Sequence, residues 1–199
     1  MATCGRRPSR RREHGLLVAA LLGACDDDAG GVIDRAAVPA VEACDGVRKW
    51  PRAASSRPRR CWARSTMRAR SPALRRARAF PAAPALAPRP RSTCAARVQA
   101  QFLADGAPLG HAGVDDDDPD DRVAAAGYDA SLSSELVALG DVSPADIVAR
   151  LWQPSAAHCA ALHGPQWRHA GAAVVQVADT EADADSEPRD VFVLVLAAP

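Results

Sequence analysis

Aromatic side chains are scarce in this chain. Phe, Tyr and Trp together make up 4% of its 199 residues, so a packed core must rest on Ala, Val and Leu, which bury less area each. We therefore expect a small core of about 100 residues, at the low end of domain sizes.

Acidic residues are missing from a long stretch. No Asp or Glu lies between Gly46 and Ala104, where Arg is dense, whereas acids dominate from Asp105 onward. The formal net charge of +1 is therefore misleading, because it sums two opposite blocks.

Residues 46–95 repeat Arg and Pro without helical or strand periodicity. Three interpretations stay open: a disordered basic segment, an electrostatic nucleic-acid binder, and GC-rich coding sequence translated in a shifted frame. We favour the shifted frame, because recognisable pattern returns abruptly at about Ala96. Nucleic acid is not expected as a partner, since the chain begins with an export signal.

Residues 1–25 have the three parts of that signal: a basic start, a short apolar run at 15–24, and small residues before a cysteine. The apolar run is shorter than the roughly 20 residues that a membrane-spanning helix needs. Because Leu22-Gly-Ala-Cys25 resembles the bacterial lipobox, we predict that Cys25 is lipidated and anchors the protein to the membrane. An ordinary signal peptide is the alternative, and Arg10-Arg11 hints weakly at twin-arginine export.

Four cysteines remain beyond the signal: Cys44, Cys61, Cys94 and Cys159. An even number is compatible with disulfides in an exported protein, although sequence does not fix their pairing. The residues at 26–45 are expected to form a linker, with one short helix near 38–44.

Regular helix signals begin at about Ala96, so we place a domain at 96–199. We expect helices at 96–104 (with Val98, Phe102 and Leu103 inward), 122–126 and 144–153. A short turn or helix is expected to begin at His158, with Leu162 buried. Gly127 is the expected C-cap of the second helix. The third has Ser143 as N-cap and Pro144 at its first position, and its inward face is expected to hold Ile147, Val148, Leu151 and Trp152.

Loops and strands complete the expected domain. The acidic run at 115–121 is expected to be a solvated loop, because it lacks the ligand spacing of a calcium-binding EF-hand. Two β-rich runs at 172–177 and 191–196 indicate an antiparallel pair joined by an acidic loop. Helices followed by such a pair favour an α+β sandwich over a doubly wound parallel sheet.

A series of motifs then resembles the bacterial branch of the CAP superfamily (cysteine-rich secretory, antigen 5 and pathogenesis-related 1 proteins; SCP-like domains). The matching elements, in family order and spacing, are Gly110-His111-Ala-Gly113, Asp118-Pro119-Asp-Asp-Arg122, Gly127-Tyr128, Glu135-Leu136, Trp152-Gln-Pro-Ser-Ala-Ala-His158, Ala161-Leu162 and Gly171. The resemblance covers about 96–197 and implies an α-β-α sandwich. The sandwich is expected to be incomplete, since the family's first helix is not found in the Arg/Pro-rich half.

Several positions depart from the family pattern. The Asn that follows the family Glu is Leu136 here, the Asn of Asn-Ile is Ala161, and a His of the upstream helix is Gln99. The resemblance implies that His111, Glu135 and His158 line one open cavity. Two neutral imidazoles and a carboxylate suit Zn²⁺ or another divalent metal, with His111 and His158 as ligands. Alternatively, the Glu orients an imidazole as a general base.

Two functions compete. The first is a non-enzymatic, lipid-anchored or secreted cell-envelope protein whose cavity binds a metal, a small ligand or a cell-wall component. The second is a peptidase-like CAP hydrolase, although no credible nucleophile stands beside His158: Cys159 is expected to be paired or buried, and no Gly-x-Ser-x-Gly elbow surrounds Ser133 or Ser134.

Overall fold

A computed structural model describes residues 2–3, 38–50, 79–80, 84–177 and 189–199. The predicted lipid anchor Cys25, the apolar run at 15–24, Cys61 and most of the Arg/Pro-rich segment lie outside these ranges. Among the helices that are described, none combines the length and the apolar character needed to cross a bilayer.

A mixed sheet of four strands forms the middle layer, in the order β3-β5-β6-β4. The strands are β3 (Ala87–Pro88), β4 (Leu132–Gly140), β5 (His169–Gln176) and β6 (Asp190–Ala198). β6 is antiparallel to both β4 and β5, and β3 is parallel to β5. A separate pair joins β1 (Ala2–Thr3) to β2 (Ala79–Phe80).

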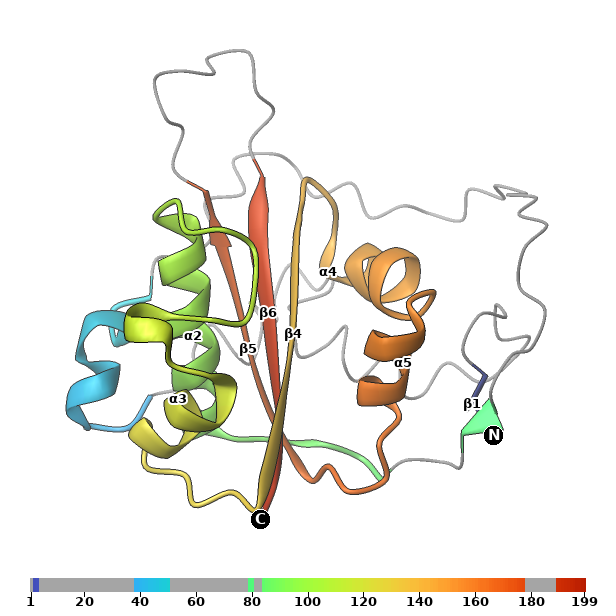
Figure 1. The fold of residues 1–199 in the computed structure, drawn as a ribbon, viewed down its shortest axis with the longest axis horizontal. Coiled ribbons are helices and arrows are strands. Elements are labelled where there is room, and N and C mark those ends of the chain that lie inside the picture. The colour runs from blue at the N-terminus through green and yellow to red at the C-terminus, as the bar shows by residue number, and fades with distance from the viewer. Residues whose placement is uncertain (1, 4–37, 51–78, 81–83, 178–188) are drawn as a thin grey trace, which may run out of the picture.

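Helices cover both faces of this sheet (Figure 1). One layer contains α2 (Pro90–Ala104) and α3 (Pro119–Ala125), with the short helices η1 (Glu42–Val47) and η2 (Val114–Asp116) beside them. The other contains α4 (Pro144–Asp146), η3 (Ile147–Trp152) and α5 (Ala156–Leu162). The predicted α+β sandwich is confirmed, and so are its antiparallel C-terminal strands.

The two sides of the sheet are packed with different side chains. Trp152, Phe192 and Leu194 are fully buried on the α4–α5 side. The α2 side uses mainly Ala and Val, which lets the helix approach the strands closely. At the contact of α2 with β5, a Cβ on Gly171 would lie 2.5 Å from the Ser92 carbonyl oxygen, so only glycine fits there.

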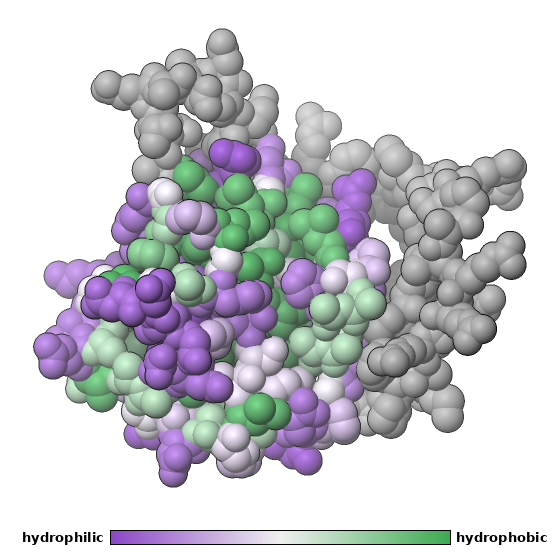
Figure 2. Space-filling model, in the orientation of Figure 1, coloured by the Kyte–Doolittle hydropathy of each residue, from purple (hydrophilic) through white to green (hydrophobic). Residues whose placement is uncertain are grey.

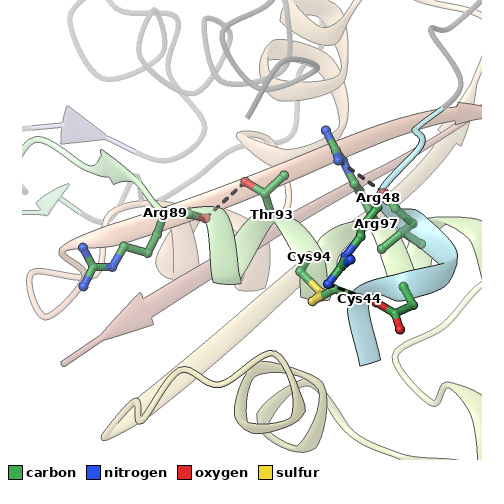
Figure 3. The surroundings of a disulfide bond; sticks show 8 residues. Cys44, Arg48, Arg89, Thr93, Cys94 and Arg97 are labelled. Carbon is green, nitrogen blue, oxygen red and sulfur yellow. Dashed lines mark hydrogen bonds and ion pairs between the residues drawn. A yellow bond between two sulfur atoms is a disulfide. The ribbon is translucent and has the colours of Figure 1, made fainter. Parts of the chain in front are cut away.

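A disulfide between Cys44 and Cys94 joins η1 to α2 (Figure 3). Beside it, the buried Arg97 donates a hydrogen bond of 3.3 Å to the Val47 carbonyl, and its guanidinium lies 5.3 Å from the Trp50 ring centre. The short helix expected near 38–44 is therefore present as η1. It is held to the domain covalently, by a cation–π contact and by a hydrogen bond.

The first predicted helix begins earlier than expected. α2 starts at Pro90, not at Ala96, so the end of the Arg/Pro-rich segment is helical. Of its expected inward residues, Leu103 is buried, whereas Val98 and Phe102 are only half-buried. The disulfide and the Arg97 contacts turn this helix so that its small residues face the sheet: Ala95, Ala96 and Ala100.

The helix capped by Ser143 has a π-helical second half. Ser143 Oγ accepts the Asp146 N–H as predicted, and Ile147, Val148 and Trp152 are buried. Leu151 was expected inward but is 45% exposed. Five-residue spacing aligns Ile147 with Trp152 and leaves Leu151 to one side, which a pattern based on an α-helix does not anticipate.

The acidic run is more ordered than a solvated loop. Asp118 caps α3 in a reciprocal capping box with Asp121, and Asp117 pairs with Arg122 at 2.6 Å. Asp115 and Asp116 have positive φ values of 56° and 60°, a region that Asp adopts more readily than most residues. Gly127, with φ of 79°, ends α3 at the predicted position.

Candidate functional site

His111 and Glu135 are in direct contact. The loop after α2 carries His111, whose side chain is 51% exposed, and β4 carries Glu135, whose side chain is fully buried. Their Nδ1 and Oε1 atoms are 3.0 Å apart. The buried carboxylate therefore fixes the orientation of a half-exposed imidazole and leaves its Nε2 edge for other partners.

Arg122 of α3 neutralises this carboxylate. Its Nη2 donates to Glu135 Oε2 at 3.1 Å and to the His111 carbonyl at 2.8 Å, and the side chain is 2% exposed. Its Nη1 donates to Asp117 Oδ1 at 2.6 Å. A guanidinium with several donors in a fixed fork suits this position, because it satisfies two carboxylates and a carbonyl at once.

Gln99 and Gly113 hold the loop that carries His111. Gln99 is buried in α2, and its amide donates to the Gly110 and Ala112 carbonyls at 3.0 and 3.2 Å. A Cβ on Gly113 would collide with Asp117 Oδ1 and lie 2.6 Å from Arg122 Nη1. The Gln that replaces a family His here thus has a structural role, and the glycine makes room for the ionic contacts.

His158 of α5 lies close enough to His111 to sense its charge. Burial lowers the pKa of His158 below its usual value, and the positive charge of His111 lowers it further. The ring atom Nδ1 is buried and has no hydrogen-bond partner in the part of the chain described. A buried polar atom without a partner is costly, so its presence at this position needs a structural or functional reason.

The two imidazoles differ in protonation. The hydrogen bond that His111 donates to Glu135 raises the pKa of this imidazole, against the opposing effects of burial and of the Arg122 charge. The pKa of His158 is shifted in the opposite direction, below its usual value. The two pKa values are therefore pushed apart, so that on acidification His111 takes up its proton before His158 does.

His111, Glu135 and His158 do not form a set of three free metal ligands. In the described ranges, no group of three or more His, Cys, Asp or Glu side chains is arranged to hold a metal ion. Glu135 already uses both oxygens, one for His111 and one for Arg122. A zinc site that includes this carboxylate would have to break one of these contacts.

Two of the three side chains considered as nucleophiles, Cys159 and Ser133, are engaged by other groups. Cys159 is buried and disulfide-bonded, as the sequence led us to expect. Ser133 Oγ donates to Asp120 at 2.5 Å. The remaining histidines differ as well: His169 contacts the hydroxyl of Tyr128, and His163 is buried.

Sequence reasoning gave Arg122 and Gln99 no role at the site. Arg122 belongs to a matched motif, and Gln99 stands where the resembling family has a His. Their positions in the motif series were the only indication of a role. Their function depends on contacts that sequence spacing does not show.

Comparison with known proteins gives few matches. A scan against protein-family models finds none, and no curated protein matches. Two solved structures are similar to this chain. An outer surface protein of Borrelia burgdorferi is 21% identical, with a TM-score of 0.45 over 57% of this chain and 77% of its own.

The other similar structure is an extracellular protein of Bacillus anthracis that contains an SCP domain. It is 17% identical, with a TM-score of 0.47, over 59% of this chain and 35% of its own. At such low identities and TM-scores, neither structure indicates what this chain binds.

Proposed function

We propose that this chain is an exported cell-envelope protein with a CAP/SCP-like domain, whose site at His111, Glu135 and His158 binds a small ligand or a cell-wall component without catalysis. The motif series and the α+β sandwich support the family assignment. The ligand site is supported by the contacts around His111.

One observation carries the ligand-binding role. A fully buried Glu135–Arg122 pair is directed at a single half-exposed imidazole. Burying an ion pair costs more free energy than packing apolar residues in the same space, so such a pair is weak evidence of a purely stabilising role. The Glu135–Arg122 pair does have a positioning role, because it holds His111 in one orientation near His158, whose Nδ1 has no partner among the described residues.

Titration of the full chain with soluble peptidoglycan fragments tests this proposal, with the imidazole signals followed by NMR. Binding should shift the signals of His111 and His158 and leave that of His169 unchanged. The variants His111→Ala and His158→Ala should each weaken binding at least tenfold, whereas the control His169→Ala should not. Fragments that leave all imidazole signals unchanged would contradict a cell-wall ligand.

The same samples address the hydrolase alternative. A CAP-type peptidase would release cleaved fragments over time, and His111→Ala would stop the release. Because Cys159 is paired and Ser133 donates to Asp120, we expect the fragments to stay intact.

A metal at His111 and His158 is the second candidate, motivated by two neighbouring imidazoles. Bound Zn²⁺ would supply a Lewis-acidic centre with open positions. Both imidazoles must be neutral to bind, so the affinity should fall as the pH drops through the pKa of His111, which lies above its usual value of about 6.5. Calorimetric titration with Zn²⁺ should show binding in the parent and in His169→Ala, and its loss in either site variant.

Lipid anchoring at Cys25 belongs to the same proposal and rests on Leu22-Gly-Ala-Cys25 behind the basic and apolar leader. Cys25→Ser should move the protein from the membrane fraction to the soluble fraction and remove its lipid, as detected by mass spectrometry. Unchanged partitioning would point to an ordinary signal peptide.

A further inference from the structure

The strand β4 has one open edge. It pairs with β6 along its whole length, and it is the last strand in the sheet order. Open edges present unpaired N–H and C=O groups, and proteins usually block them. Among the described residues, only two side chains form hydrogen bonds with the backbone at this edge.

Those two contacts show which backbone groups of β4 point away from β6. Asp120 Oδ1 accepts the Ser133 N–H at 3.1 Å, and Trp152 Nε1 donates to the Val137 carbonyl at 3.3 Å. Backbone groups alternate along an antiparallel strand, so Ser133, Glu135, Val137 and Leu139 direct theirs away from β6. The backbone N–H and C=O of Glu135 and Leu139 also point away from β6. Among the described residues, no other element forms a hydrogen bond with them.

Exposed apolar side chains collect around this edge. Leu132 begins β4, Val142 follows its end, and Leu151 lies on η3, which packs against β4. Leu109 and Val114 flank His111 in the loop that reaches Glu135. These five are the exposed large hydrophobic residues of the described chain, and Figure 2 shows apolar surface in the middle of this face. Apolar surface along an exposed strand edge marks a candidate binding site.

One end of the edge is acidic. Five exposed carboxylates stand on or beside η2 and α3: Asp115, Asp116, Asp118, Asp120 and Asp121. Asp120 itself bonds Ser133 of β4, which places this group at the beginning of the strand. A partner that lies along β4 would meet apolar side chains along the strand and negative charge at this end.

We propose that the open edge of β4 binds an extended segment of a partner protein by β-strand addition, and that this segment alternates apolar and basic side chains. Backbone hydrogen bonds to Glu135, to Leu139 and to the N–H of Val137 supply affinity, because the Val137 carbonyl already accepts from Trp152. The apolar and acidic surroundings supply selectivity. A second copy of this chain is a poorer occupant, because it would bring its own α3 and η3 to an edge where both already stand. This interaction goes beyond the proposed ligand site, since it depends on the backbone of β4.

Fluorescence anisotropy with labelled ten-residue peptides tests the proposal on the full chain. A peptide that alternates Val and Lys should bind, and one that alternates Val and Glu should bind at least tenfold more weakly. A Val-Lys peptide methylated on alternate backbone nitrogens keeps its side chains but loses donors, so it too should lose at least tenfold. Equal binding of the methylated peptide, or no binding of the Val-Lys peptide, would overturn strand addition.

Two protein variants locate the binding site. Val137→Pro removes an outward N–H without touching the ladder to β6 and should abolish peptide binding, whereas the matched control Val137→Thr should retain it. Replacing Asp115 and Asp116 by Asn keeps residues that tolerate their positive φ, and should weaken binding of the Lys peptide several-fold at low salt. This second variant keeps the test decisive if the proline variant does not fold.

Sedimentation velocity tests whether a second copy of this chain occupies the edge instead of a partner peptide. A dimer that forms in the parent and disappears in Val137→Pro would assign the edge to a second copy and overturn the peptide proposal. A monomer at all concentrations, together with peptide binding, supports it. His111→Ala should leave peptide binding unchanged, so failure of the ligand site and failure of the edge can be told apart.

Discussion

The two helical layers are attached to the sheet in different ways. On the α4–α5 side, large apolar side chains such as Trp152 and Phe192 are fully buried. On the α2–α3 side the apolar contacts are made mainly by Ala and Val, and the buried pair of Arg122 with Glu135 joins α3 to β4. A disulfide within this layer ties η1 to α2. One layer is held to the sheet by large apolar side chains, and the other by small apolar side chains and an ion pair.

This difference separates stability from function. Ionic contacts in the interior have strict geometry and high desolvation costs, so they position groups better than they stabilise a fold. The polar layer accordingly supplies the loop of His111 and the guanidinium that faces Glu135. The apolar layer supplies His158 from α5, a helix whose buried residues are Cys159 and Leu162.

The largest effect is expected from the apolar layer. Trp152→Ala removes a fully buried ring and should lower the free energy of unfolding by about 3–5 kcal/mol, the usual penalty for a large aromatic cavity. Urea denaturation followed by circular dichroism measures it. Leu151→Ala, on the same helix but exposed, should change stability by no more than about 0.5 kcal/mol. Equal losses in the two variants would contradict the π-helical register.

In the polar layer, Arg122→Ala leaves a buried carboxylate without a counterion. The free energy of unfolding should fall by about 3–5 kcal/mol at neutral pH, since the remaining charge is uncompensated. Arg150→Ala is the control, because its pair with Asp146 is exposed and 3.8 Å long. Replacing Arg122 by Met together with Glu135 by Leu should restore most of the stability and release His111. Failure of that double variant to recover would show that the ionic pair itself stabilises the layer.

Loss of the disulfide should have a smaller effect. Cys44 and Cys94 are 50 positions apart, and removing a cross-link over a loop of this length costs about 2–4 kcal/mol through the entropy of the unfolded chain. Replacing both cysteines by Ser and measuring the urea midpoint tests this. Proteolysis should then begin at η1, while the apolar layer stays resistant. A midpoint equal to that of the parent would mean that Arg97 and Trp50 hold η1 without the disulfide.

The smallest effect concerns protonation. His111, whose pKa is raised, contributes stability that is fully present below about 6.5 and is lost as the pH rises through its folded pKa. His158, whose pKa is lowered, contributes stability that is present above about 6.5 and is lost on acidification through its folded pKa. NMR titration should therefore find His111 titrating above His158.

Glu135→Gln removes the main cause of the His111 shift and should lower the pKa of that imidazole. His111→Ala should raise the pKa of His158, because a neighbouring positive charge is lost. A reversed order of titration in the parent would contradict the contact between Glu135 and His111.

Local signals were enough to predict part of this fold. Ser143 and Pro144 mark a helix start, and Gly127 marks a helix end, because capping depends on a few adjacent backbone groups. The apolar run of β6 identifies a strand that is buried on both faces. These features need no distant partner, so a single sequence reveals them.

Other features depend on residues far away in the chain. β4 was not predicted, because Ser133, Ser134 and Glu135 interrupt its β-rich pattern and its pairing with β6 defines it. The burial of Arg97 requires Val47, which lies 50 positions away, and Trp50 beside it. At the site, the family resemblance placed His111 near Glu135, but the guanidinium that makes a buried carboxylate tolerable was visible only in three dimensions.

The position of β6 has a consequence for how the protein is made. This strand follows β4 and β5 in sequence but lies between them in the sheet, so neither has its main partner until β6 leaves the ribosome. The sheet cannot assemble from its N-terminal end, and folding must wait for synthesis to pass Ala198 at about 5–20 residues per second. Until then β4 and β5 lack the strand that joins them in the sheet.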